Sequence, residues 1–450
     1  MKLEVERGPT ALTDLGNCER FARDHGGSVK FVHRWGKWLW WNGRYWEADN
    51  NGEIDRLAKQ TSLHIYAEAA DFTDKKEAQA VARWAHQSQS RHRLTAMLEL
   101  AKSELPIPLD HETLDSDPWS LNCENGTVDL QTGKLHKHRP EDFQSMTTGV
   151  DYPTTDQPAK LWSRFLSETF EGNQELIGFL QRFCGLALIG KVYEHILAMA
   201  IGSGDNGKSV TTETFCNVLG DYALSAQQGL ITTETRGVSS QGLSKLFRKR
   251  LVIVSETNDG ARLNEGLVKR ITGGDRICDR NLYENFWEFD PTHTLLLVTN
   301  HRPIVKGTDH AIWRRIRLIP FNAKIAVQKQ DKKLVEKLRD EYPAILRWMV
   351  QGCLEYQKNG LQEPEEVLWA TNEYRGQQDT LGGFIEECCM VNPKYQIKAG
   401  SLYAAYRHWA ETTGEKVETQ RNFGQSMTDR GYDRKRNNGI WYQGLTLDGA

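Results

Sequence analysis

The 450-residue sequence lacks the patterns that mark a membrane or secreted protein. No apolar run approaches the roughly 18 residues that a transmembrane helix needs. The N-terminal stretch MKLEVERGPTALTD has no apolar segment of the kind found in signal peptides. The eight cysteines contain no C-x-x-C pair, and Cys388-Cys389 is their only close pair, which argues against a zinc site. We therefore predict free thiols, a cytoplasmic location and no association with membranes.

An excess of one charge is also missing. Lys and Arg total 57 against 60 Asp and Glu, so the formal net charge is −3. This balance excludes a chain-wide basic surface, and any nucleic-acid site must be a local patch. The composition, 39% hydrophobic and 26% charged, is that of an ordinary globular protein, and the length suggests about two to four domains.

The most informative stretch is Ile196–Thr211, ILAMAIGSGDNGKSVT. An apolar run leads into G-x-x-x-x-G-K-S and then into a helix-compatible segment, which is the context that a phosphate-binding loop requires. Glycines let backbone N–H groups point at phosphate oxygens, and the following helix adds its dipole. A glycine turn without a ligand is the disfavoured alternative. The predicted loop comprises Gly202, Ser203, Gly204, Asp205, Asn206, Gly207, Lys208 and Ser209.

These residue types predict a nucleoside triphosphate bound with Mg²⁺. Lys208 can reach the β- and γ-phosphates, and the Ser209 hydroxyl can bind Mg²⁺. Glu256 ends the apolar segment RLVIVSE, where a carboxylate holds Mg²⁺ or polarises the attacking water. Asn300 follows the apolar segment TLLLVT, and its amide can orient that water; its alternative role is to cap a turn.

Four apolar segments alternate with polar helices, which predicts an α/β sheet with its ligand at the strand ends. Between the second and third of them, Leu263–Pro291 predicts two strands joined at Leu282–Asn285 in a projecting hairpin. The four predicted strands are Ile196–Ile201, Leu251–Val254, Thr294–Val298 and Ile316–Pro320.

Two stretches outside the loop suggest further contacts. Arg314 and Arg315 lie in TDHAIWRRIRLIPF, and an arginine given to a neighbouring subunit's γ-phosphate would stabilise the transition state; a surface ion pair is the alternative. Five tryptophans lie between Trp35 and Trp46 around an Asn-Gly hairpin signal. They form either a surface that stacks on bases or, as we favour, the core of a small sheet.

The C-terminal segment has the size and pattern of a winged helix. Two predicted helices, Ser401–Thr412 and Gln420–Arg430, precede a hairpin over Gly431–Leu447. A solvated face on a packing module is the alternative to a DNA-binding role. The basic residues that we predict to bind DNA are Arg421, Arg434, Lys435 and Arg436.

Five segments resemble, in order and spacing, those of superfamily 3 helicases: GSGDNGKS, LVIVSET, LVKRITGGD, LLLVTNHRP and DHAIWRRIRLIPF. They are most similar to the helicase part of phage and plasmid primase-helicases (the virulence-associated/phage DNA primase family), including the poxvirus-type proteins. LNCENGTVDLQTGKL resembles the region before that helicase. The resemblance implies an α/β P-loop NTPase core of the AAA+-like type, with an N-terminal α+β domain and a C-terminal winged-helix-like domain. The implied division is an N-terminal domain 1–152, a core 160–325 with a helical lead-in 160–194, a helical extension 326–376, and the winged-helix-like domain 380–450.

The same resemblance implies an ATP-dependent DNA helicase that acts in phage, plasmid or mobile-element replication. Such motors are rings, usually homo-hexamers, that pull one DNA strand through a pore and work with single-stranded and duplex DNA and a separate primase. It implies that Glu256 is the Walker B acid, Asn300 the polar sensor, and Arg314 or Arg315 the finger. It also implies that the hairpin grips DNA through Arg280, Asn281 and Tyr283.

The sequence departs from the family pattern in two ways. Many relatives have two adjacent acids at the Walker B position, whereas Ser255 precedes Glu256 here, so Glu256 acts either alone or with Asp259. Larger relatives carry a primase domain; we find no room for one in this chain and expect no primase activity. An initiator or loader that assembles on DNA without processive unwinding has the same sequence features, and only a strand-displacement assay separates it from a helicase. Two further alternatives, a P-loop phosphotransferase and a catalytically silent DNA-binding scaffold, have fewer supporting features.

Overall fold

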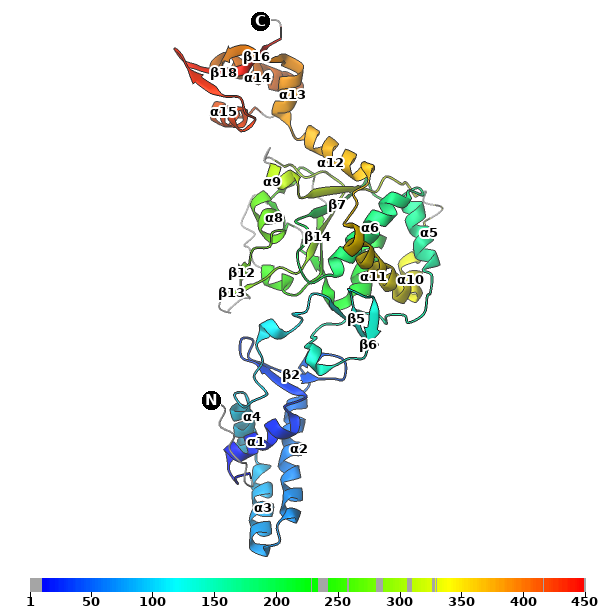
Figure 1. The fold of residues 1–450 in the computed structure, drawn as a ribbon, viewed down its shortest axis with the longest axis vertical. Coiled ribbons are helices and arrows are strands. Elements are labelled where there is room, and N and C mark those ends of the chain that lie inside the picture. Colours follow the sequence, from blue (N-terminus) through cyan, green and yellow to red (C-terminus); the bar gives the residue numbers. More distant parts are fainter. Residues whose placement is uncertain are drawn as a thin grey trace.

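The computed structural model describes residues 10–227, 229–233, 242–256, 259–280, 286–305, 310–325, 328, 330–415 and 417–448. These residues form three parts along the long axis of the molecule (Figure 1). A helical N-terminal unit is followed by a central sheet with helices on both faces, and helix α12 leads from there into a small C-terminal unit. No helix in the described ranges is both long and apolar enough to cross a membrane.

The N-terminal unit combines four helices with an antiparallel sheet of order β1-β2-β3. The hairpin between β2 and β3 turns at Asn42 and Gly43, as predicted. Gly43 has φ of +94°, which glycine adopts without strain. Trp46 is buried, and the other four tryptophans pack against buried clusters, so the aromatic stretch forms the core of this sheet. The elements are α1 (Asp14–His25), β1 (Val29–Val32), β2 (Lys37–Trp41), β3 (Trp46–Ala48), α2 (Glu53–Glu68), α3 (Lys75–Ser88) and α4 (Arg91–Ala101).

A second antiparallel sheet connects this unit to the centre of the molecule. It has the order β4-β5-β6 and consists of β4 (Ser120–Cys123), β5 (Gly126–Asp129) and β6 (Lys134–His136). Leu121, Val128 and Leu130 are fully buried in the same cluster as helices α6 and α11. In packing, these strands therefore belong with the central core, although the sequence analysis groups residues up to 152 with the N-terminal domain.

The central sheet has five parallel strands in the order β15-β7-β14-β10-β8. They are β7 (Leu197–Ile201), β8 (Ala223–Ala226), β10 (Leu251–Glu256), β14 (Thr294–Thr299) and β15 (Ile316–Pro320). All four predicted strands are present, and the predicted α/β class with a parallel sheet is confirmed. The fifth strand, β8, has the sequence ALSA, which carries little strand signal.

Both faces of the sheet are covered, so its side chains alternate between two cores. In β7, Ala198 and Ala200 join the cluster with α6 and α11, while Leu197 and Met199 join the opposite cluster with α8 and α12. The helices are α5 (Lys160–Thr169), α6 (Gln174–Leu188), α7 (Lys208–Leu219), α8 (Glu265–Ile271), α9 (His310–Trp313), α10 (Leu334–Leu338), α11 (Tyr342–Asn359) and α12 (Glu365–Gln377). Two short strands, β9 (Thr232–Thr233) and β11 (Arg262–Leu263), pair beside this sheet.

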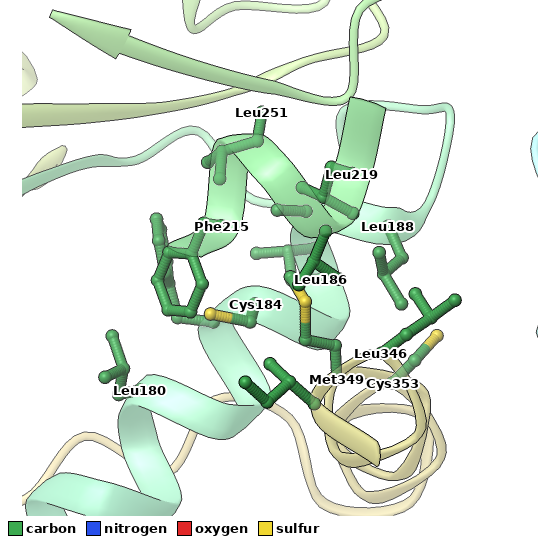
Figure 2. Packing of buried hydrophobic residues seen from close by; sticks show 14 of the residues in the cluster. Leu180, Cys184, Leu186, Leu188, Phe215, Leu219, Leu251, Leu346, Met349 and Cys353 are labelled. Atoms are coloured by element: carbon green, nitrogen blue, oxygen red, sulfur yellow. The ribbon is translucent and has the colours of Figure 1, made fainter. Parts of the chain in front are cut away.

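Helices α6 and α11 cross at two glycines. A Cβ atom on Gly185 would lie 2.0 Å from the backbone nitrogen of Cys353, and one on Gly352 would lie 2.0 Å from the carbonyl oxygen of Gln181. Next to this crossing, Cys184 and Met349 are fully buried (Figure 2). The backbones are thus in direct contact, which no larger residue at either position permits.

The C-terminal unit has its own core and a sheet of order β16-β18-β17. The predicted two helices and hairpin are present, and α13 and β16 precede them. Phe384, Tyr406 and Phe423 form the centre of the core, with Tyr406 and Phe423 rings 4.8 Å apart. The elements are α13 (Thr380–Cys388), β16 (Cys389–Lys398), α14 (Ala399–Thr413), α15 (Gln420–Asp429), β17 (Arg434–Arg436) and β18 (Ile440–Leu447).

Candidate functional site

The glycine-rich loop joins β7 to α7 at the carboxyl edge of the central sheet. Gly204 and Gly207 have φ of +101° and +88°, in the region that favours glycine. A Cβ on Gly207 would also lie 2.8 Å from Oγ1 of Thr169 on α5, so glycine is needed there for space as well. Because α7 begins at Lys208, the free N–H groups of its first turn lie beside the loop. This arrangement suits an anionic ligand.

Lys208 is held inside the loop. Its Nζ donates to the carbonyl oxygen of Gly202 at 2.7 Å and to Oδ1 of Asn206 at 2.9 Å. The Nδ2 atom of Asn206 donates in turn to the carbonyl oxygen of Phe321, just beyond β15. Lys208 is 5% exposed, and burial lowers the pKa of its ammonium group. Asn206 thus links the lysine to a neighbouring strand, a role that the motif alone does not reveal.

A cleft of about 360 Å³ opens in front of this loop. Its size is typical of small-ligand sites. Its loop wall is polar, while Leu161, Phe165 and Leu334 make the other side partly apolar. The sequence predicts the loop, Asn300 and, in the amphipathic region Leu161–Leu188, a lid or collar beside the loop, and α5 of that region does form one wall of the cleft. The wall from the segment after β15 is not predicted. The lining residues are Leu161, Arg164, Phe165, Glu168, Gly204–Val210, Asn300, Ile325, Gln330, Asp331, Lys332 and Leu334.

The strand register aligns the predicted polar residues along one edge. Ile201 pairs with Thr299, and Thr299 pairs with Glu256, so β14 lies between the loop strand and β10. Asn300 follows β14 and lines the same cleft as Lys208. The structure describes the backbone of Glu256 but not its side chain, so its predicted contacts remain a prediction. The exposed Asp259 carboxylate lies 3.6 Å from Nδ1 of His301, which is adjacent to Asn300.

The two candidate finger arginines have different environments. Arg315 is 7% exposed, and its guanidinium donates to Oγ1 of Thr272 at 3.1 Å and to the carbonyl oxygen of Ala311 at 2.7 Å. Arg314 is exposed. Since a finger must leave its own subunit to reach a neighbour's phosphate, the geometry favours Arg314. The nearby Arg317 forms an ion pair with Glu363.

The predicted hairpin is present as β12 (Ile277–Asp279) paired antiparallel with β13 (Trp287–Phe289). Its tip, with Asn281 and Tyr283, lies outside the described residues. The Arg280 guanidinium stands 4.6 Å from the ring centre of Phe286, whose side chain is 62% exposed. A cation and an exposed ring are therefore adjacent at the start of the tip.

Around the start of β13, this hairpin contacts the N-terminal unit. The Arg34 guanidinium donates to the carbonyl oxygen of Phe286 at 2.9 Å. The Trp287 ring lies 4.9 Å from that of Phe247 and 5.6 Å from that of His111. Phe247 also contacts Trp35 of the N-terminal unit. These contacts hold the hairpin against a unit far away in the sequence, and no local pattern predicts them.

The basic residues predicted to bind DNA at the C-terminus differ in how far their side chains contact other residues of the unit. Arg421 lies on α15 and is exposed, as are Lys435 and Arg436 on β17. Arg434 donates to the carbonyl oxygen of Gly424 and lies over the Tyr442 ring, so part of its side chain is engaged within the unit.

The donor types at the cleft suit Mg²⁺ with a phosphate-bearing ligand. Ser209 is exposed at the start of α7 and lines the cleft, and hydroxyl and carboxylate oxygens are what Mg²⁺ prefers. Within the described part of the chain, no group of three or more His, Cys, Asp and Glu residues could hold a metal ion. Among the described side chains, the fit therefore rests on the Ser209 hydroxyl and on the ligand's own oxygens, and the role of Glu256 stays a prediction.

The fold and the site define an α/β protein with a G-x-x-x-x-G-K-S loop at the edge of a parallel sheet. Two family models match parts of it: "D5 N terminal like" over residues 18–171 and "Family of unknown function (DUF5906)" over residues 200–315. "Putative helicase L207/L206" of Acanthamoeba polyphaga mimivirus is 29% identical over 321 residues, covering 66% of this chain and 33% of that protein. "Putative primase C962R" of African swine fever virus (isolate Tick/Malawi/Lil 20-1/1983) is 26% identical over 331 residues, covering 67% and 34%.

The chain thus spans about a third of the length of these curated relatives. A solved structure titled "The A form apo structure of NrS-1 C terminal region-CTR" has the same fold, with a TM-score of 0.52 at 10% identity over 99% of this chain and 100% of that one. The chain is thus similar to a D5-type family model and to viral putative helicases and primases, and the resemblance predicted from the motifs is confirmed.

Proposed function

We propose that this protein is an ATP-dependent DNA helicase of viral, plasmid or mobile-element replication that works as a homo-hexameric ring with Mg²⁺. The observation that carries the proposal is the shared cleft, where the loop with Lys208 and the residue Asn300 meet at the carboxyl edge of the sheet. The names of the viral relatives support the DNA-replication context. We further propose that the chain has a P-loop core and a winged-helix-like C-terminal unit as its motifs indicate, with the sheet β4-β5-β6 assigned to the core and not to the N-terminal domain.

The site's own residues have distinct roles in this proposal. Lys208 would exchange its bonds to Gly202 and Asn206 for phosphate oxygens, and the first turn of α7 would add N–H donors. Ser209 and Glu256 would hold Mg²⁺, which neutralises phosphate charge. Glu256 would also orient the attacking water, together with the amide of Asn300. The hairpin with Arg280, Asn281 and Tyr283 would grip DNA.

The experiment that tests this function is steady-state ATP hydrolysis with and without single-stranded DNA, followed by strand displacement from a forked duplex. We expect turnover to rise several-fold with DNA and the duplex to be unwound. Turnover that ignores DNA would favour the phosphotransferase alternative. DNA-stimulated turnover without displacement would favour the initiator or loader.

Arg314 offers a test of ring assembly. We expect Arg314→Ala to bind ATP normally and to hydrolyse it poorly, because the missing charge belongs to a neighbour's site. Mixed with Lys208→Ala subunits at equal amounts, it should recover about a quarter of wild-type sites by random pairing around a ring. The measurement is ATPase activity against the mixing ratio.

The control variants for this experiment separate a finger from a structural arginine. Arg315→Ala should lower the unfolding temperature, since its guanidinium is buried and hydrogen-bonded. Arg407→Ala, on the exposed face of α14, should leave activity unchanged. If no mixture of Arg314→Ala with Lys208→Ala regains activity, Arg314 does not act between subunits.

A further inference from the structure

The sheet of the C-terminal unit is strongly basic. Its three strands contain no Asp or Glu. They carry five cationic residues, Lys394, Lys398, Arg434, Lys435 and Arg436. In a chain with a net charge of −3, these strands concentrate positive charge, and the natural partner of their exposed cations is a polyanion.

A tryptophan lies on one face of this sheet, between two of the lysines. In the strand register, Trp441 of β18 pairs with Lys398 of β16 on one side and with Lys435 of β17 on the other. Directly paired residues share one face of a sheet, so the three side chains form a Lys–Trp–Lys row. The next residues of β16 and β18, Ile397 and Tyr442, are buried in the core. The row therefore lies on the opposite, solvent-facing side.

A hydrogen bond holds the Trp441 ring in place, and the ring does not pack in the core of the unit. Its Nε1 donates to the carbonyl oxygen of Asn437 at 2.8 Å, which fixes the ring beside the hairpin turn. Among the described residues, the apolar side chains that pack on the core of this unit do not include Trp441. Lys398 and Lys435 are exposed. A preoriented aromatic face between two cations is the arrangement that stacks a nucleobase and neutralises the phosphates beside it.

Helix α15 is less suited to DNA than this sheet face. Its only cation is Arg421, which Asp429 on the same helix balances, and Phe423 and Met427 face the core. Arg421 is the one residue of this helix that the sequence predicts to bind DNA. The charges favour the sheet, and a tryptophan face can stack on a base only where that base is unpaired.

We propose that Trp441, Lys398 and Lys435 form a stacking site for an unpaired base of single-stranded DNA. This inference rests on the proposed function for its ligand class, but it adds a site outside the motor and a preference for single strands over duplex. Stacking is tolerant of base identity, so no sequence specificity is expected.

The test is equilibrium binding of the full chain, without nucleotide, to labelled oligothymidine and to a duplex of equal length, followed by fluorescence anisotropy. We expect Trp441→Ala to weaken single-strand binding about 5- to 150-fold and duplex binding little. Trp441→Phe should restore most of the loss. The matched control is Trp369→Ala, which removes a tryptophan that is 68% exposed on α12, next to Glu365 and Glu366, and should change neither affinity.

Salt dependence separates stacking from phosphate contact. Affinity falls as salt rises, so the slope of log affinity against log salt is negative. Lys398→Ala and Lys435→Ala should each make this slope less steep by about 0.7, whereas Trp441→Ala should leave it unchanged. An unaltered single-strand affinity in Trp441→Ala, or an equal loss for duplex, would overturn the proposal. The binding assay contains no nucleotide, so it gives a result even if the protein does not hydrolyse ATP. The stacking site and the proposed helicase function can therefore be refuted independently.

Discussion

Replacing Lys208 with alanine is expected to reduce ATP hydrolysis by a factor of about 10³ or more. The ammonium group lies in the cleft, and its hydrogen bonds within the described part of the chain go to two oxygens of its own loop, Gly202 O and Asn206 Oδ1. Phosphate oxygens can replace both acceptors, and no other cation of the loop can take its place. The measurement is the initial rate of phosphate release at saturating ATP, with and without single-stranded DNA.

A second lysine of the same cleft provides the control. Lys332 lines the cleft at its exposed rim, so Lys332→Ala should change the rate only slightly. Both variants should unfold at nearly the wild-type temperature, which would show that the loss is chemical. If Lys208→Ala keeps a tenth or more of the wild-type rate, hydrolysis takes place elsewhere and the cleft is not the motor site.

Replacing Arg250 with methionine is expected to destabilise the central part by about 3–5 kcal/mol. This guanidinium is 2% exposed and donates to the carbonyl oxygens of Pro118 at 2.8 Å, of Ser120 at 3.0 Å and of Leu188. It thus joins the start of β10 to the entry of the second sheet and to the end of α6. Methionine fills similar volume but removes the side-chain donor from the buried carbonyl groups of Ser120 and Leu188, whereas the Pro118 carbonyl keeps its bond from the backbone N–H of Gly190.

Arg250 also has electrostatic support. The carboxylates of Asp115 and Asp117 raise the pKa of its guanidinium, and burial, the larger effect, lowers that pKa. The Tyr222 ring lies 5.4 Å away and covers the cation. The measurement is the urea midpoint followed by tryptophan fluorescence. Arg248→Met is the matched control, because Arg248 is only partly buried and makes a single backbone bond, to Glu112 at 2.7 Å. Equal midpoints for the two variants would show that the buried bonds of Arg250 contribute little.

Much of the fold can be predicted because its signals are local. The loop residues, the four apolar strands, the hairpin at Asn42-Gly43 and the helix–helix–hairpin order at the C-terminus each depend on a short stretch of sequence. The strand β8 is missing from the prediction because ALSA has neither alternation nor β-branched residues. Its place in the sheet comes from pairing with β10, which is a tertiary contact.

The candidate site could be predicted in part. Lys208 and Asn300 do share a cleft, as the strand-end argument predicts. The amphipathic region Leu161–Leu188 is predicted beside the loop, and α5 does line the cleft. The wall from the segment after β15 could not be foreseen, because a helical pattern reveals that a segment packs but not against what. Arg314 and Arg315 are neighbours with identical chemistry, and only packing separates the exposed one from the buried one.

By itself, the sequence determined the residues and spacing of the glycine-rich loop, the family resemblance and the α/β class, because spacing, residue type and hydrophobic period are properties of contiguous stretches. The tertiary structure decided the strand order that places β14 between the loop strand and β10, and the contact of the hairpin with Arg34 and, through Phe247, with Trp35. It also decided the crossing of α6 and α11 at Gly185 and Gly352, where glycine is required by a backbone from another helix. Register, burial and close approach depend on residues far apart in the chain, and for a single sequence only the folded structure brings them together.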